Sequence, residues 1–155
     1  MITGAWHFSF TVSNLERSVQ WWTEVLGCEY VRGQEQANPY TRRLVGFSDA
    51  HLKVAQLRIP GAPLPRSLHH IELVEYVAPR GRELDLATNN TGVAHLAFQV
   101  DDIHAEFERM RALGVRFKSD APNLIEAGVN KGGYSIYFLD PDGITLEIVQ
   151  PPPQT

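Results

Sequence analysis

Two histidines and two glutamates stand at matching places in the two halves of the sequence. His95 follows His7 by 88 residues, and Glu147 follows Glu72 by 75 residues. Each lies in an apolar stretch, where a buried carboxylate is costly unless it is paired or bound to a metal. Two imidazole nitrogens and two carboxylate oxygens suit zinc, nickel, cobalt, manganese or iron. The four residues therefore predict a divalent metal site.

Each of these residues has a plainer interpretation when it is taken alone. A single histidine on a strand is more often a packed or surface residue than a ligand, and a single glutamate can face solvent on an edge strand. The recurrence of the same two residue types at equivalent places in both halves favours the metal site.

The elements that must position these residues form an internal repeat. The segment 4–12 matches 92–100 in glycine, histidine, phenylalanine and valine, and 71–75 resembles 146–150. Alternating residue types predict strands in all four segments, with His7 on one face and its apolar neighbours on the other.

A helix is expected after the first strand of each repeat. Ser13 and Glu16 read as a capping box for one helix, and Asp101 as a cap for the other. Gly27 and Gly114 are expected just beyond the two C-termini. The expected buried residues lie at helical spacing: Leu15, Val19, Trp22 and Leu26, then Ile103, Phe107, Met110 and Leu113.

The remaining strands complete an α+β fold of two βαβββ modules. The modules are expected over 1–77 and 92–150, with a polar linker at 78–91 and a frayed tail at 151–155. The loop 119–133 is long enough to suggest a functional role. Further strands are predicted at Cys28–Arg32, Leu52–Ile59, Val115–Lys118 and Tyr134–Leu139.

Composition excludes several classes of function. The chain has 155 residues, 43% of them hydrophobic and 21% charged, as is typical of a globular domain. A net charge of −4 lacks the basic footprint of a nucleic-acid binder. Cys28 is the one cysteine, so neither an internal disulfide nor a thiolate zinc site can form. No secretory signal or membrane-spanning segment is expected, which predicts a cytoplasmic protein.

Taken in order, these segments resemble the vicinal oxygen chelate superfamily (glyoxalase, bleomycin resistance protein and dioxygenase), in its glyoxalase I and methylmalonyl-CoA epimerase branch. The resemblance covers roughly Trp6 to Gln150. The matching segments are Asn14–Ser18 with Leu26–Gly27, Ile71–Leu73, Gly92–His95, Val100–Asp102, Asp140–Gly143 and Leu146–Glu147.

The resemblance implies that the two modules form a half-open barrel around a divalent metal held by His7, Glu72, His95 and Glu147. It implies proton transfer alpha to a carbonyl or thioester through a metal-stabilised enediolate, with Glu147 as the first candidate for the base and Glu72 as the second. The expected partner is a small carbonyl or thioester substrate, with no nucleic acid or membrane. A homodimer is also expected, with the cavity inside one chain or between swapped chains.

Departures from the family pattern narrow this expectation. Ring-cleaving dioxygenases and fosfomycin transferases lack the ligand that Glu72 supplies, which favours lyase or isomerase chemistry. Thr11 and Tyr76 replace an arginine and an asparagine that serve glutathione in glyoxalase I, so glutathione is not expected. Two alternatives stay open: an iron(II) extradiol-type dioxygenase, and a non-catalytic resistance-type binder whose cavity walls include Trp6, Trp21 and Trp22.

Residues around the site are less sharply defined by the sequence. His70 shares strand parity with Glu72 and is a candidate for the cavity wall, with a surface position as the alternative. Tyr40, Arg42 and Arg43 are candidates for binding an anionic substrate, or form a solvated loop. Lys131–Gly133 resembles a family segment that borders the pocket, and also fits a plain turn.

Overall fold

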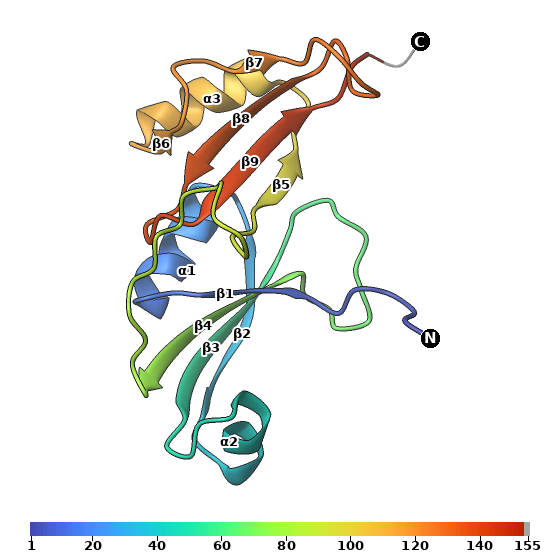
Figure 1. Ribbon diagram of the computed structural model, residues 1–155. Coiled ribbons are helices and arrows are strands. Elements are labelled where there is room, and N and C mark those ends of the chain that lie inside the picture. Colours follow the sequence, from blue (N-terminus) through green and yellow to red (C-terminus); the bar gives the residue numbers. More distant parts are fainter. Residues whose placement is uncertain (154–155) are drawn as a thin grey trace. The chain divides into compact units, whose positions relative to one another are not determined.

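The computed structural model describes residues 1–153 and divides into two compact units, Met1–Glu83 and Leu84–Thr155. Each unit contains one sheet (Figure 1). The elements of the first unit are β1 (Phe8–Thr11), α1 (Leu15–Glu24), β2 (Glu29–Gln36), α2 (Pro39–Val45), β3 (His51–Arg58) and β4 (Ile71–Ala78). Those of the second unit are β5 (Leu96–Gln99), α3 (Ile103–Ala112), β6 (Arg116–Phe117), β7 (Asn123–Leu124), β8 (Tyr134–Leu139) and β9 (Thr145–Gln150).

The two sheets share one topology. In the first unit the strand order is β1-β4-β3-β2, and in the second it is β5-β9-β8-β6, with β7 added beside β8. The first strand of each unit pairs in parallel with the last, and the other strand pairs in the main order are antiparallel. The α+β class and the repeated strand-helix-strands order are confirmed. The half-open barrel concerns both units together and stays a prediction.

Helices α1 and α3 are each joined to their sheet by a hydrogen bond at the same place in the repeat. The carboxylate of Glu75, which lies within β4, accepts the N–H of Leu15, the first residue of α1, at 2.8 Å. At the equivalent place in the second unit, the Gln150 amide oxygen accepts the N–H of Ile103 at 2.9 Å. Both side chains stand three residues beyond the glutamate expected to bind metal, so one strand positions both the site and the helix.

The helix caps lie one residue later than the sequence suggested. Asn14 caps α1 by accepting the N–H of Arg17, so the capping box at Ser13 is wrong. Asp102 caps α3 by accepting the N–H groups of His104 and Ala105, so Asp101 is not the cap. In both cases the cap is the nearest extended residue whose side-chain oxygen reaches the first turn.

The glycines predicted just beyond the C-termini of α1 and α3 are found there in one case of the two. Gly114 directly follows the cap residue of α3 with φ +80°, whereas Gly27 is two residues beyond the cap residue of α1 with φ +67°. Leu113, expected in the core, is 54% exposed because it is the cap residue and lies outside the regular helix.

Each unit has its own apolar core. Trp22 of α1 is fully buried and packs against Phe10, with ring centroids 5.4 Å apart. In the second unit Ile103, Phe107 and Met110 are buried as predicted. The other large apolar side chains that are fully buried are Leu57, Ile71, Leu73, Ile136, Phe138, Leu146 and Ile148.

Residues 39–45, expected as a loop, form the short helix α2. Asn38 caps it by accepting the N–H of Thr41, Pro39 occupies its first turn, and Gly46 ends it with φ +79°. The strand predicted at 28–32 begins at Glu29 and continues to Gln36. The long loop 119–133 contains the two-residue strand β7.

No helix within residues 1–153 is long and apolar enough to span a membrane. Residues 151–153 have no regular structure, and the remainder of the predicted frayed tail, 154–155, lies outside the described residues.

Candidate metal centre

The first unit brings His7 and Glu72 together through the parallel pairing of β1 with β4. Ser9 is in register with Glu72, and His7 stands two residues before Ser9. Because alternate residues of an extended chain share a face, the imidazole and the carboxylate lie on the same side of the sheet. His7 Nε2 is 3.5 Å from Glu72 Oε2.

The second unit repeats this arrangement with His95 and Glu147. Ala97 is in register with Glu147, and His95 again stands two residues earlier. His95 Nε2 is 3.2 Å from Glu147 Oε2. The structure thus brings the predicted residues together as two pairs, one in each unit. Their assembly into one site stays a prediction.

The donor set of each pair fits a divalent cation. Nitrogen and oxygen ligands of zinc lie about 2.0–2.2 Å from the ion, so two of them are about 3.0–3.4 Å apart in octahedral or tetrahedral geometry. The nitrogen–oxygen separations of 3.5 and 3.2 Å are close to that range. Each pair therefore offers one imidazole nitrogen and one carboxylate oxygen at a spacing that a single ion can bridge.

Glu72 is held firmly by its neighbours. Gln56, which faces it in register on β3, donates from Nε2 to Glu72 Oε1 at 3.1 Å. Arg32 on β2 donates from Nε to Gln56 Oε1 at 2.6 Å and so fixes the amide orientation. Gln56 is buried, so this three-residue chain restrains the carboxylate.

Glu147 has a different partner at the equivalent strand position. Tyr137 on β8 faces Glu147 in register, where the first unit has Gln56. Burial, and then the Glu147 carboxylate, raise the pKa of Tyr137 above its usual value. Within residues 1–153, Glu147 has no hydrogen bond from a side chain besides its contact with His95. Glu147 is thus less restrained than Glu72.

A third histidine, His69, joins the first pair and was missed by the sequence analysis. His69 Nε2 lies 3.3 Å from His7 Nδ1 and 3.9 Å from Glu72 Oε1, and the two imidazole rings stack with centroids 5.2 Å apart. Nitrogen and oxygen atoms of these three residues lie within 4.8 Å of one another.

His70, the predicted candidate for the cavity wall, does not line the site. Its Nδ1 accepts the N–H of Ile59 at 3.0 Å, so the ring caps the preceding turn. The prediction assumed that alternate residues share a face as far back as His70. The strand β4 begins only at Ile71, and the chain before it bends at Leu68, which has φ +63°, so this alternation does not extend to His70. The same bend brings His69 to the site, so no residue spacing in the sequence predicts its position.

A cavity of about 340 Å³ adjoins the first pair. Tyr40 lines it, whereas Arg42 and Arg43 are exposed on α2 and do not line it, so anion binding by the two arginines stays a prediction. Trp21 and Trp22 also do not line it, because they lie on α1. The polar lining side chains are His7, Ser9, Gln34, Gln36, Tyr40, Glu72 and Tyr76.

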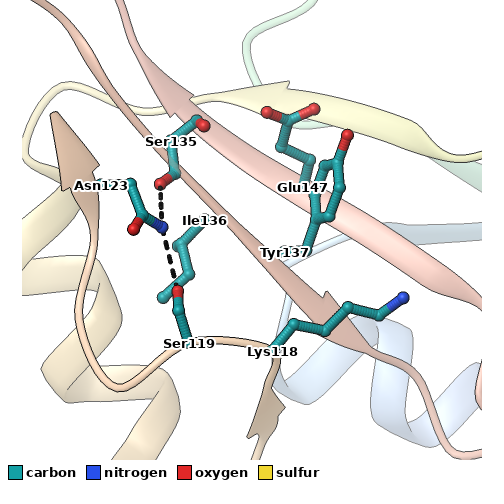
Figure 2. Close-up of a pocket in the computed structure, with 7 residues that line it drawn as sticks. All are labelled: Lys118, Ser119, Asn123, Ser135, Ile136, Tyr137 and Glu147. Carbon is teal, nitrogen blue, oxygen red and sulfur yellow. Dashed lines mark hydrogen bonds between the residues drawn. The ribbon is translucent and has the colours of Figure 1, made fainter. Parts of the chain in front are cut away.

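A second cavity, of about 360 Å³, adjoins Glu147 (Figure 2). Asn123 donates from Nδ2 to Ser119 Oγ at 3.0 Å and to the carbonyl of Ser135 at 3.4 Å, which ties the loop to β8. Lys131 of the predicted bordering segment does not line this cavity. Its polar lining side chains are Lys118, Ser119, Asn123, Ser135, Tyr137 and Glu147.

The repeated fold with its paired histidines and glutamates defines a known family. The chain belongs to the Glyoxalase/Bleomycin resistance protein/Dioxygenase superfamily, which it matches over residues 5–148. This confirms the resemblance inferred from the sequence.

Curated relatives of the chain are enzymes. It is 35% identical to a 2-epi-5-epi-valiolone epimerase from Actinomyces sp. over 150 residues, which cover 94% of this chain and 78% of the relative. It is 30% identical to a lactoylglutathione lyase from Haemophilus influenzae over 149 residues, covering 93% and 90%.

Solved structures share the fold. A glyoxalase family protein from Bacillus cereus superposes with a TM-score of 0.76 at 17% identity, covering 95% of this chain and 93% of that protein. A fosfomycin resistance protein from Listeria monocytogenes, crystallised with Mn(II) and sulfate, gives a TM-score of 0.57 at 23% identity, covering 97% and 93%. A divalent metal is therefore present in a protein of the same fold.

Proposed function

We propose that this chain is a metal-dependent lyase or isomerase that transfers a proton on the carbon next to a carbonyl or thioester, without glutathione in its substrate. The observation that carries the proposal is the pair of histidine–glutamate contacts at equivalent register positions, with Glu72 more restrained than Glu147. The relatives support it, since they include an epimerase and lactoylglutathione lyases.

The proposal assigns His7, Glu72, His95 and Glu147 to one divalent ion, supplied by one chain or by the two chains of a homodimeric cytoplasmic enzyme. Zinc, nickel, cobalt, manganese and iron all accept this mixed nitrogen and oxygen donor set. When bound, such an ion stabilises the negative charge that develops on a substrate carbonyl oxygen as the neighbouring carbon loses its proton.

Glu147 is assigned the role of general base. The base must accept a proton, carry it to the opposite face of the substrate or to the adjacent carbon, and release it there. A carboxylate that does this needs freedom to move. Glu147 is the less restrained of the two glutamates, since it contacts His95, whereas Glu72 contacts His7 and is also held by Gln56, which Arg32 holds in turn. The proton passes from the substrate carbon to the carboxylate and returns to the opposite face or to the adjacent carbon, so the reaction needs no oxidant. Such positioned proton transfer contributes roughly 10²–10⁴ in rate.

The two cavities favour an uncharged, hydrogen-bonding substrate. Hydroxyl and amide groups supply most of their polar lining outside the proposed ligands, with Lys118 as the single cationic side chain. Among the described residues that line the two cavities there is no arginine, the residue best suited to bidentate carboxylate binding. This lining offers little to the carboxylates of glutathione. The epimerase relative makes 2-epi-5-epi-valiolone the first substrate to test.

The test is exchange of the substrate proton in deuterated water. The protein is loaded in turn with each candidate metal and incubated with 2-epi-5-epi-valiolone, α-branched acyl thioesters and the hemithioacetal of methylglyoxal and glutathione. Deuterium incorporation by the wild type, lost at least 100-fold in Glu147→Gln, would support the proposal. Turnover of the glutathione adduct at ordinary enzymatic rates would contradict the exclusion of glutathione. Oxygen uptake with a catechol, and no proton exchange in any substrate, would replace the proposal with dioxygenase chemistry.

A further inference from the structure

His69 has a defined tautomer because of its backbone partner. Its side chain is 2% exposed, and Nδ1 lies 2.9 Å from the carbonyl oxygen of Ser67. A carbonyl oxygen can only accept a hydrogen bond, so Nδ1 of His69 carries the proton and donates it. In the neutral ring, Nε2 of His69 is left with its lone pair and can only accept.

The lone pair of His69 in turn defines the tautomer of His7. His7 Nδ1 lies 3.3 Å from His69 Nε2, and His7 Nε2 faces Glu72 Oε2 at 3.5 Å. A neutral imidazole has one ring proton, and the nearer acceptor is His69. With the proton on Nδ1, the lone pair of His7 Nε2 is directed to the same side as the Glu72 carboxylate, as a metal ligand requires.

Within residues 1–153, this chain of hydrogen bonds is present in only one of the two repeats. Glu147 follows Glu72 by 75 residues, and the same offset places Ile144 at the position of His69. Ile144 has no nitrogen to accept from His95, whose ring instead packs against Tyr137 with centroids 5.1 Å apart. His95 is also more exposed than His7, at 40% against 27%.

We propose that His69 is a positioning residue: its Nε2 accepts a hydrogen bond from Nδ1–H of His7. This bond fixes the orientation of the His7 ring and leaves the lone pair on His7 Nε2 free to bind the metal. Metal-binding histidines usually donate their second ring N–H to a carboxylate, a carbonyl or water, and here another histidine takes that place. The metal role rests on the proposed function, whereas the hydrogen-bonded chain from Ser67 to His7 can be tested without metal.

The first measurement is the tautomer of His7 in the metal-free protein. Long-range ¹H–¹⁵N spectra distinguish the two neutral tautomers and the imidazolium, and His7→Ala and His69→Leu assign the signals. We expect the neutral form of each ring to carry its proton on Nδ1. The Nε2–H tautomer at His7 would overturn the proposed chain.

The second measurement is zinc affinity by chelator competition. We expect His69→Leu to weaken binding about 10–100-fold, the usual effect of losing such a partner. His69→Gln, whose amide oxygen can accept from His7, should recover part of the loss. His70→Leu is the matched control, because His70 contacts Ile59 and not the site, and it should bind zinc like the wild type.

The outcomes separate this proposal from the proposed function. Equal zinc affinity of the wild type and His69→Leu would overturn the positioning role while leaving the metal site intact. Failure of the wild type to bind any divalent metal would overturn the proposed function and the metal role of His69, and the tautomer spectra would still decide whether the chain exists. If His69→Leu does not fold, the comparison of His69→Gln with the wild type decides the affinity test.

Discussion

The hydrogen bonds that join α1 and α3 to their sheets predict how much different substitutions at Glu75 and Gln150 destabilise the protein. An N-cap side chain reaches the second and third N–H groups of a helix and leaves the first unpaired. Glu75 accepts that first N–H in α1, and Gln150 accepts it in α3. Substitutions at these two positions therefore test the same bond with a charged and a neutral acceptor.

The magnitudes follow from the charge and the partial burial of the bond. Loss of a neutral acceptor at a helix start costs about 1 kcal/mol, which is the expectation for Gln150→Ala. A negative charge near a helix N-terminus adds about 0.3–1 kcal/mol, so Glu75→Ala should cost about 1.3–2 kcal/mol. Glu75→Gln keeps the acceptor and should lose only the charge contribution. Gln150→Glu should stabilise the second unit by a similar small amount.

The assay is chemical denaturation with two probes. All three tryptophans, Trp6, Trp21 and Trp22, lie in the first unit, so their fluorescence reports its unfolding, and circular dichroism at 222 nm reports all helices. Glu75→Ala should shift the fluorescence transition and Gln150→Ala should leave it unchanged. The reasoning fails if Glu75→Gln is as destabilising as Glu75→Ala, or if both alanine variants unfold like the wild type.

Three further predictions concern the site, the core and the free thiol. His7→Ala and His95→Ala should each lower the amount of bound metal at least tenfold, as measured by elemental analysis after dialysis. The circular dichroism spectra of both variants should stay close to that of the wild type. Unchanged metal content in both variants would contradict the shared site. Phe138→Ala, at a fully buried position, should lower the free energy of unfolding by about 3–5 kcal/mol, and a loss below about 1 kcal/mol would show that the second core is not packed as described. Burial raises the pKa of the Cys28 thiol to about 12. The folded protein should therefore react with iodoacetamide at pH 8 much more slowly than the urea-unfolded chain. Because only the unfolded chain releases this proton between pH 9 and pH 12, Cys28 should lower stability by about 1.4 kcal/mol per pH unit in that range; a Cys28→Ser variant with the same slope would refute this.

The parts of this molecule that could be predicted from sequence are those governed by strand alternation within the repeat. His7 and Glu72 could be paired in advance because both lie where alternate residues share a face, and the same holds for His95 and Glu147. His69 could not, because it lies in the bend before β4, where alternation gives no direction. The bonds of Glu75 and Gln150 were also missed, since their partners are 60 and 47 residues away. Helix α2 has seven residues, too few to show a helical period.

The parallel pairing of β1 with β4 has a consequence for the order of folding. Phe8 pairs with Ile71, 63 residues along the chain, whereas β2, β3 and β4 form successive antiparallel neighbours with shorter connections. Contacts between distant residues must overcome a larger loop-closure entropy, and they slow folding. We therefore expect β2, β3 and β4 to associate first and β1 to dock last. His7 reaches Glu72 only in that last step, so the refolding chain gains the His7–Glu72 contact at the end of folding and not at the beginning.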